Sequence, residues 1–255
     1  MPGKKTPKPV KAADGCVWIT GASSGIGAAL AVEMAQRGWT VIISARRADA
    51  LTEIAARHEN IIAVACDVTD RPAMAECVKM IEDTHGPIAM AVANAGIYLP
   101  TTLPEFDAEI FDRSFAVNIT GTVNLLAPVV PLMTQRGKGQ IVLVSSVAGY
   151  NGLPTSAAYG ATKAALLNMG EAMAMDLRRS GVMVNMIAPG FVDTPATKPN
   201  KFKMPFLMDV ELAARRIADG LAAGKTRLSF PRRFTVWLRL LTYLPRSWVV
   251  SLLGK

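Results

Sequence analysis

The sequence predicts one α/β domain in which helices cover both faces of a doubly wound parallel β-sheet. Three observations lead to this fold class. The chain has 255 residues, a length common for undivided α/β domains. Of these residues 51% are hydrophobic and only 19% are charged, which suffices for a large core. Short β-branched runs alternate with longer segments of helical composition, as in repeated βαβ units with right-handed crossovers.

This alternation places each strand and helix in order along the chain. Strands are expected at 16–20, 40–45, 61–66, 88–93, 140–145 and 183–187, with a seventh at 227–230. Helices are expected at 25–37, 48–57, 71–84, 105–133 and 157–180. Residues 191–207 contain three prolines and are expected to form a long irregular loop, typical of lids and binding loops. We find no uninterrupted apolar stretch long enough to span a bilayer.

The net charge of +8 comes from the two ends of the chain. Residues 1–13 carry four Lys and no acid, and residues 225–255 carry seven Lys and Arg and no acid. We therefore divide the chain into a basic N-terminal tail (1–13), a catalytic domain (14–230, with a substrate loop at about 190–208) and a basic amphipathic C-terminal tail (231–255). A nucleic-acid face is not expected, because the central stretch is nearly neutral.

Histidine chemistry and metal binding are not expected. The only two histidines, His58 and His85, lie far from each other in sequence and from any Cys pair. Cys16, Cys66 and Cys77 are odd in number, lack a C-x-x-C spacing and sit in apolar runs, which indicates reduced core residues. Together with a lysine-rich start that lacks an apolar segment, this predicts a cytoplasmic protein.

A glycine-rich turn connects the first predicted strand to the first predicted helix. Its sequence is TGASSGIG at 20–27. Glycines let the backbone approach a ligand closely, and the free N–H groups of a helix start attract phosphate. We therefore expect a pyrophosphate site formed by Gly21, Ser23, Ser24, Gly25, Ile26 and Gly27. A tight turn with nothing bound would also use glycines, and the spacing differs from the G-x-G-x-x-G fingerprint, so the turn alone leaves both readings open.

Six motifs, in this order, resemble those of the short-chain dehydrogenase/reductase family. They are TGxxxGIG at 20–27, Asn94-Ala95-Gly96, Asn118, Ser146, Tyr159-x-x-x-Lys163 and Pro189-Gly190-x-x-x-Thr194. Their joint occurrence is far more specific than any single motif. The resemblance implies a Rossmann-like NAD(P)-binding fold and an oxidoreductase that acts on the CH–OH group of a small molecule without a metal. It also implies a homodimer or homotetramer.

The predicted catalytic residues are Asn118, Ser146, Tyr159 and Lys163. Tyr159 and Lys163 are four residues apart at the start of a helix, so both lie on one face. An ammonium and an oxidised nicotinamide ring would lower the pKa of the phenol toward the working pH, which makes Tyr159 a general acid and base. Ser145 competes with Ser146, but the resemblance favours Ser146 as the residue that orients the substrate oxygen. It also implies that Asn118 holds a water that connects Lys163 to solvent.

The end of the second predicted strand favours NADP over NAD. Arg46 and Arg47 follow this strand, and no carboxylate occurs before Asp49. A guanidinium suits a 2′-phosphate, whereas an NAD site places a carboxylate there, although two arginines could also merely cap a surface strand. The resemblance implies further cofactor contacts from Asp67, Val68, Asn94, Ala95, Gly96, Tyr159, Lys163, Pro189, Gly190, Val192 and Thr194.

The C-terminal tail combines an apolar stripe with arginines. Apolar residues recur three and four apart between 237 and 252, and Pro245 is expected to precede a second short helix. Such helices could pack across a subunit interface or over the substrate cleft, or they could bind the surface of an anionic membrane. Either reading suggests an apolar substrate, because an apolar segment near the cleft would favour one.

We expect an NADP-dependent enzyme that transfers hydride reversibly between the cofactor and a carbonyl or secondary alcohol. The alternative is a cofactor-binding regulatory or membrane-associated scaffold protein without turnover, and the complete catalytic set argues against it.

Overall fold

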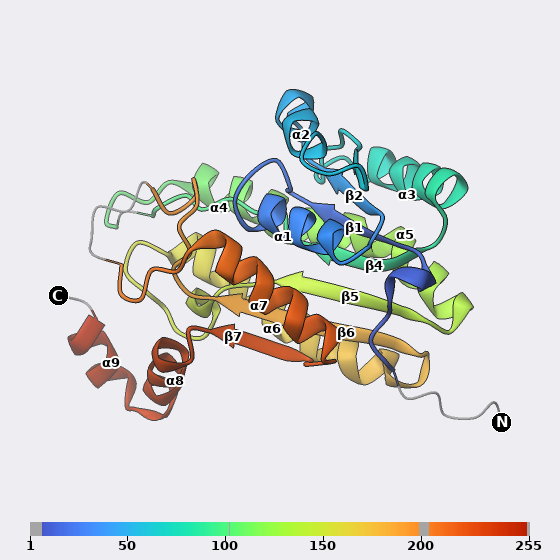
Figure 1. Cartoon of the computed structure of the whole chain (residues 1–255). Helices are drawn as coiled ribbons and strands as arrows, with labels where there is room; N and C mark the ends of the chain where they lie inside the picture. The colour runs from blue at the N-terminus through green and yellow to red at the C-terminus, as the bar shows by residue number, and fades with distance from the viewer. Residues whose placement is uncertain (1–6, 102, 199–203, 254–255) are drawn as a thin grey trace.

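The computed structural model describes residues 7–101, 103–198 and 204–253. Within these residues the chain forms a seven-stranded parallel sheet with the order β3-β2-β1-β4-β5-β6-β7 (Figure 1). All seven predicted strands are present, with some ends shifted. The strands are β1 (Cys16–Thr20), β2 (Val41–Ser44), β3 (Ile61–Ala63), β4 (Ile88–Ala93), β5 (Gly139–Val144), β6 (Val182–Pro189) and β7 (Arg227–Phe230).

Helices cover both faces of this sheet, which confirms the doubly wound architecture. They are α1 (Gly25–Gln36), α2 (Ala48–Ala55), α3 (Arg71–His85), α4 (Ala108–Phe115), α5 (Gly121–Arg136), α6 (Ala157–Asp176), α7 (Val210–Ala222), α8 (Arg232–Leu240) and α9 (Arg246–Leu253). Helices α1 and α7 pack side by side over one core cluster, and α3, α5 and α6 cover the cluster on the other face. The arrangement is that of a single domain.

Helix α7 is absent from the sequence-based prediction. Its N-terminus is capped by Asp209, whose carboxylate accepts a hydrogen bond from the Leu212 N–H at 2.9 Å. Its buried residues Ala213, Ile217 and Leu221 are four apart and join the core shared with α1. Both signals, an Asp cap and a helical apolar period, are in the sequence. The helix provides the crossover from β6 to β7.

The long helix predicted at 105–133 is two α-helices joined by a π-helical turn. Helix α4 begins at Ala108, the turn η2 spans Ala116–Thr120, and α5 continues to Arg136. By length and composition the whole segment could cross a membrane, contrary to our expectation that no stretch is long enough. However, Leu125, Val129 and Met133 of α5 are buried in the core between the sheet and α3. This is the ordinary place of a crossover helix.

Both predicted tails pack at least partly onto the domain. Residues 1–6 lie outside the described residues, but Val10 is buried and its N–H donates a hydrogen bond to the Gln140 side chain at 3.0 Å. At the other end, Phe234 and Leu238 of α8 are buried against Val147. The described part of each tail is therefore continuous with the packed domain.

We predict that Ile217→Ala lowers the free energy of unfolding by about 2–5 kcal/mol, because this fully buried side chain joins α7 to the core. The measurement is urea denaturation followed by circular dichroism. Arg216→Ala, on the exposed face of the same helix, is the control and should change stability by less than about 0.5 kcal/mol. Equal losses in the two variants would contradict the packing role of α7.

Candidate active site

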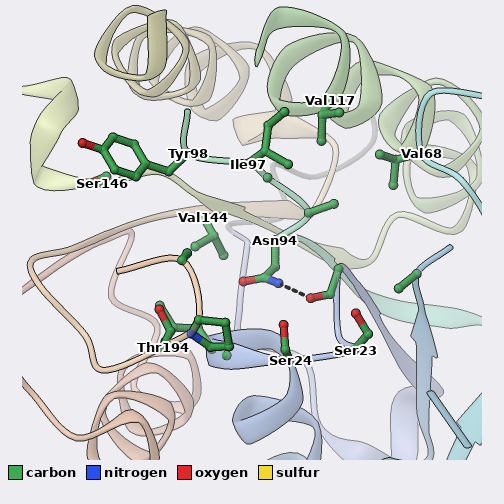
Figure 2. Close-up of a pocket in the computed structure, with 18 of the residues that line it drawn as sticks. Ser23, Ser24, Val68, Asn94, Ile97, Tyr98, Val117, Val144, Ser146 and Thr194 are labelled. Atoms are coloured by element: carbon green, nitrogen blue, oxygen red, sulfur yellow. Dashed lines mark hydrogen bonds between the residues drawn. The ribbon is translucent and has the colours of Figure 1, made fainter. Parts of the chain in front are cut away.

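A cavity of about 450 Å³ opens at the carboxyl ends of the central strands (Figure 2). Open parallel sheets bind ligands at this edge, where the strand order reverses between β1 and β4. The cavity brings together nearly all of the residues predicted to bind a cofactor or act in catalysis. Those that line it are Gly21, Ser23, Ser24, Gly25, Ile26, Arg46, Arg47, Asp67, Val68, Asn94, Ala95, Gly96, Ser146, Tyr159, Lys163, Pro189, Gly190, Val192 and Thr194.

Two predicted residues, Gly27 and Asn118, do not line the cavity but support its walls. A Cβ at Gly27 would collide with the Asn94 side chain, so this glycine allows α1 to pack against the turn after β4. Ser145, which was weighed against Ser146, also lines the cavity, and the residues that the prediction missed are Ala45, Cys66, Ile97, Tyr98, Val117, Val144, Pro195, Ala196 and Thr197. Many of them directly adjoin a predicted residue, so extending each motif by one or two positions would have found them.

The turn after β1 forms a cradle that only glycine permits. Gly21 has a φ of +66°, and a Cβ there would lie 2.6 Å from the Ala95 Cα. The Asn94 side chain donates hydrogen bonds to the carbonyls of Thr20 at 2.9 Å and Gly21 at 3.1 Å, the contact drawn in Figure 2. This turn is therefore held open toward the cavity.

The first turn of α1 faces the same cradle. Gly25 begins the helix, and the Ser24 side chain, at the N-cap, makes no capping hydrogen bond. Uncapped N–H groups and the positive end of the helix dipole attract an anion. Because the glycines leave room for close approach, these residues fit the pyrophosphate of a dinucleotide.

Tyr159, Lys163 and Ser146 lie together at the other end of the cavity. Tyr159 and Lys163 stand on the first turns of α6, with the lysine Nζ 5.5 Å from the centroid of the tyrosine ring. Ser146 lies two residues after the end of β5, and its side chain makes a hydrogen bond with Tyr159. The ring of Tyr98 meets that of Tyr159 edge to face at 5.1 Å between centroids. The cluster combines a proton donor, a hydroxyl and an amine.

Burial controls the ionisation of this cluster. It raises the pKa of Tyr159 to about 12, although the hydrogen bond with Ser146 acts in the opposite direction. It lowers the pKa of Lys163 to about 8. The prediction that the pKa of Tyr159 is lowered is thus wrong for the protein without a bound cofactor. Desolvation disfavours both charged forms, and the Lys163 amine donates its hydrogen bond to the Val144 carbonyl at 2.9 Å.

The structure separates the roles of the two neighbouring serines. Ser145 is buried, and its hydroxyl donates to the Lys163 carbonyl at 2.7 Å, which fixes α6 against the end of β5. The Ser146 hydroxyl accepts a hydrogen bond from the Ala148 N–H at 3.2 Å and also bonds with Tyr159. Ser146 is therefore the better placed of the two to meet a substrate oxygen.

Asn118 is fully buried in the π-helical turn η2. The Asn118 side-chain oxygen, Oδ1, accepts a hydrogen bond from the Ile97 N–H at 2.8 Å, and the side-chain amide donates to the Thr162 hydroxyl at 3.0 Å. Gly96 separates it from Lys163, since a Cβ there would lie 3.2 Å from the Asn118 Oδ1 and 3.3 Å from the Lys163 Nζ. Asn118 thus ties the turn after β4 to α6, and the widened helical turn accommodates a polar residue that would be unfavourable in a regular helix.

Two arginines border the cradle at the end of β2. Arg46 and Arg47 are exposed and line the cavity, and Arg47 donates a hydrogen bond to the Ser23 hydroxyl at 3.4 Å. Within the described ranges neither arginine pairs with a carboxylate. Asp49 lies in the first turn of α2 and outside the cavity lining. The rim at this point is therefore positively charged.

Comparisons with known proteins agree with this geometry. A family model described as short chain dehydrogenase matches residues 15–204. An uncharacterised oxidoreductase of Myxococcus xanthus is 37% identical over 231 residues, covering 89% of this chain and 91% of the relative. A 3-oxoacyl-(acyl-carrier-protein) reductase of Thermotoga maritima is 37% identical over 200 residues, covering 76% of this chain and 81% of the relative.

Two solved structures have the same fold. The crystal structure of a short-chain dehydrogenase from Streptomyces avermitilis aligns with a TM-score of 0.81 at 27% identity, covering 89% of this chain and 92% of that one. A structure described as ElxO with NADP bound aligns with a TM-score of 0.77, also at 27% identity, covering 85% of this chain and 96% of that one.

We predict that Lys163→Met raises the free energy of unfolding near pH 7 by about 1–3 kcal/mol, because it removes a buried amine. The pKa of Lys163 in the folded state, about 8, lies below the ordinary 10.5, so between these values the unfolded state binds more protons. Stability should therefore rise with pH across this window in the wild type, and less so in the variant. Denaturation at several pH values measures both effects.

The control for this experiment is Lys79→Met, which removes an exposed amine from α3. It should leave the pH dependence of stability unchanged. A Lys163→Met protein with the pH dependence of the wild type would contradict the buried, shifted amine.

Proposed function

The chain belongs to the short-chain dehydrogenase family, and on this premise we propose that it is an NADP-dependent oxidoreductase that interconverts a carbonyl compound and a secondary alcohol. One observation carries the proposal. The glycine cradle, the arginine pair and the Ser146, Tyr159 and Lys163 cluster line one continuous cavity. A site with this composition can hold a dinucleotide and exchange a proton with a substrate oxygen.

Tyr159 is the general acid in the direction of reduction. When bound, the nicotinamide cofactor supplies the hydride. A pKa of about 12 keeps the Tyr159 phenol protonated near neutral pH, ready to donate its proton to the substrate oxygen. Ser146, hydrogen-bonded to Tyr159, orients the same oxygen. The reverse reaction needs the phenol to take up the proton of an alcohol, which a positive charge beside the ring would favour.

Lys163 has two tasks in this scheme. Its amine lies between the Tyr159 ring and the Val144 carbonyl in the cavity lining, and it would bind the ribose hydroxyls of a dinucleotide. With its pKa lowered to about 8, it also gains or loses its charge close to neutral pH. A charged ligand in the cavity would therefore change the protonation of Lys163.

The preference for NADP rests on Arg46 and Arg47. These guanidinium groups border the cavity at the end of β2 and would bind a 2′-phosphate, whereas the carboxylate among the lining residues, Asp67, lies beyond β3. The bound NADP in the solved structure of ElxO supports this preference. The relative described as a 3-oxoacyl-(acyl-carrier-protein) reductase supports a carbonyl substrate.

We predict that Tyr159→Phe lowers the rate of NADPH oxidation with a ketone substrate by roughly 10²-fold or more, because it deletes the proton donor. The affinity for NADPH, measured by fluorescence titration, should change little, since the ring stays in place. Tyr243→Phe is the matched control, because Tyr243 is exposed and lies outside the cavity lining. A Tyr159→Phe protein as active as the control would contradict the mechanism.

The cofactor preference has its own test. Arg46→Ala and Arg47→Ala should each weaken NADPH binding by roughly ten- to a hundredfold and leave NADH binding unchanged, because each removes a charge-assisted phosphate contact. Titration of both cofactors measures the effect. Arg57→Ala, which removes a charge beyond α2 and outside the cavity lining, should change neither affinity. Equal weakening for NADH would mean that the arginines support the fold instead.

A further inference from the structure

We propose that the outer face of α8 and α9 is a docking surface for an anionic lipid bilayer. This surface is separate from the residues of the cofactor cavity. It comprises the exposed apolar and aromatic side chains of the two helices and the connection between them, together with four arginines. The residues are Arg232, Arg233, Val236, Trp237, Arg239, Leu240, Tyr243, Leu244, Arg246, Trp248, Val250 and Leu252.

The inner face of the two helices fixes their orientation. Phe234, Leu238, Leu241 and Val249 are buried and form one apolar cluster with Val147 of the domain. In addition, the Asn151 amide donates a hydrogen bond to the Leu238 carbonyl at 2.6 Å. The outer face is therefore held outward, at the corner of the molecule where α8 and α9 lie in Figure 1.

The outer face exposes large apolar side chains at helical spacing. Trp237, Leu240 and Leu244 recur three and four residues apart, and Trp248 is 65% exposed. Tyr243, in the connection between the helices, is 85% exposed. Soluble proteins seldom leave such apolar surface uncovered, and Trp and Tyr are the residues that settle at the boundary between lipid and water.

The charges on this surface have one sign. The sequence contains no Asp or Glu after Asp219. Within the described part of the chain, no carboxylate pairs with Arg232, Arg233, Arg239 or Arg246. Two of these arginines instead contact neutral groups of the domain. Arg239 stacks on the Tyr150 ring, and Arg246 donates a hydrogen bond to the Asn151 side chain. The surface is thus both apolar and positively charged without internal compensation.

This charge pattern favours a bilayer over a second copy of the chain. In a two-fold dimer the same patch would face itself, so arginines would meet arginines with no acid between them, and burial of unpaired charges is unfavourable. Anionic headgroups supply the missing charges, and the acyl boundary accepts the Trp and Leu side chains. The bilayer is the partner that satisfies both properties at once.

The test must leave α8 in place. Phe234 packs against Phe191 with ring centroids 5.7 Å apart, and its ring closely approaches Gly190, which lines the cavity. Removal of residues after 230 would therefore also remove Phe234 from its place beside Gly190, so a truncation would not test the outer face alone. Substitutions on the outer face avoid this difficulty.

The experiment is sedimentation of the full chain with vesicles of phosphatidylserine and phosphatidylcholine, compared with vesicles of phosphatidylcholine alone. We expect binding to the anionic vesicles only. The double variants Trp237→Ser/Trp248→Ser and Arg232→Gln/Arg233→Gln should each reduce the vesicle affinity about tenfold or more. The matched controls, Met175→Ser and Arg178→Gln/Arg179→Gln, change exposed residues of α6 and the turn after it and should bind as the wild type does.

A second readout comes from tryptophan fluorescence. Trp18 and Trp39 are buried, so a blue shift on addition of vesicles would report Trp237 and Trp248. Thermal unfolding shows whether each variant is folded. The proposal is overturned if the wild type ignores anionic vesicles, or if the control arginine pair weakens binding as much as the docking pair. Conversion of an oligomer to monomers by the Trp variant, without vesicle binding, would instead assign the surface to a second copy.

Discussion

The close contact between the turn after β1 and the turn after β4 is the constraint on which the site depends. Gly21 approaches the Ala95 backbone so closely that no side chain fits, and Asn94 locks the contact through hydrogen bonds to Thr20 and Gly21. This contact can form only because β1 and β4 are neighbours in the sheet. The glycine turn before α1 and the cluster of Ser146, Tyr159 and Lys163 therefore line one cavity.

The end of the cavity that holds Tyr159 and Lys163 obtains its properties from burial. Desolvation by the surrounding protein raises the pKa of the half-buried Tyr159 phenol and lowers that of the buried Lys163 amine. Both groups are therefore closer to neutral in the protein than in water, and a charged ligand in the cavity would act on them with little screening. Asn118 and Ser145 contribute indirectly, because their hydrogen bonds fix the elements that carry this pair.

The region beyond the family match gives the molecule a second kind of surface. The family model ends at residue 204, before α7, α8 and α9. Helix α7 packs beside α1 on the sheet, whereas α8 and α9 pack on Val147 with their inner face and present arginines and aromatic rings outward. The position of Phe234 against Gly190 links this surface to the wall of the active site.

The sequence by itself determined where the strands lie along the chain, where the glycine turn lies and which family the chain resembles. These features depend on patterns within a few residues, such as the β-branched runs and the spacing from Tyr159 to Lys163. The sequence also contains the signals of helix α7, which are an Asp cap and apolar residues at helical spacing after the proline-rich segment.

Only the tertiary structure decided the π-helical turn around Asn118 and the direction of the pKa shift of Tyr159. It also added a physical reason for the preference for Ser146 that the family resemblance implied, because the Ser145 hydroxyl bonds the Lys163 carbonyl where α6 packs against the end of β5. Desolvation likewise depends on groups as distant along the chain as Tyr98 and Val144. Local sequence patterns specify helices and strands, whereas the burial of a side chain depends on every helix, strand and loop that packs around it.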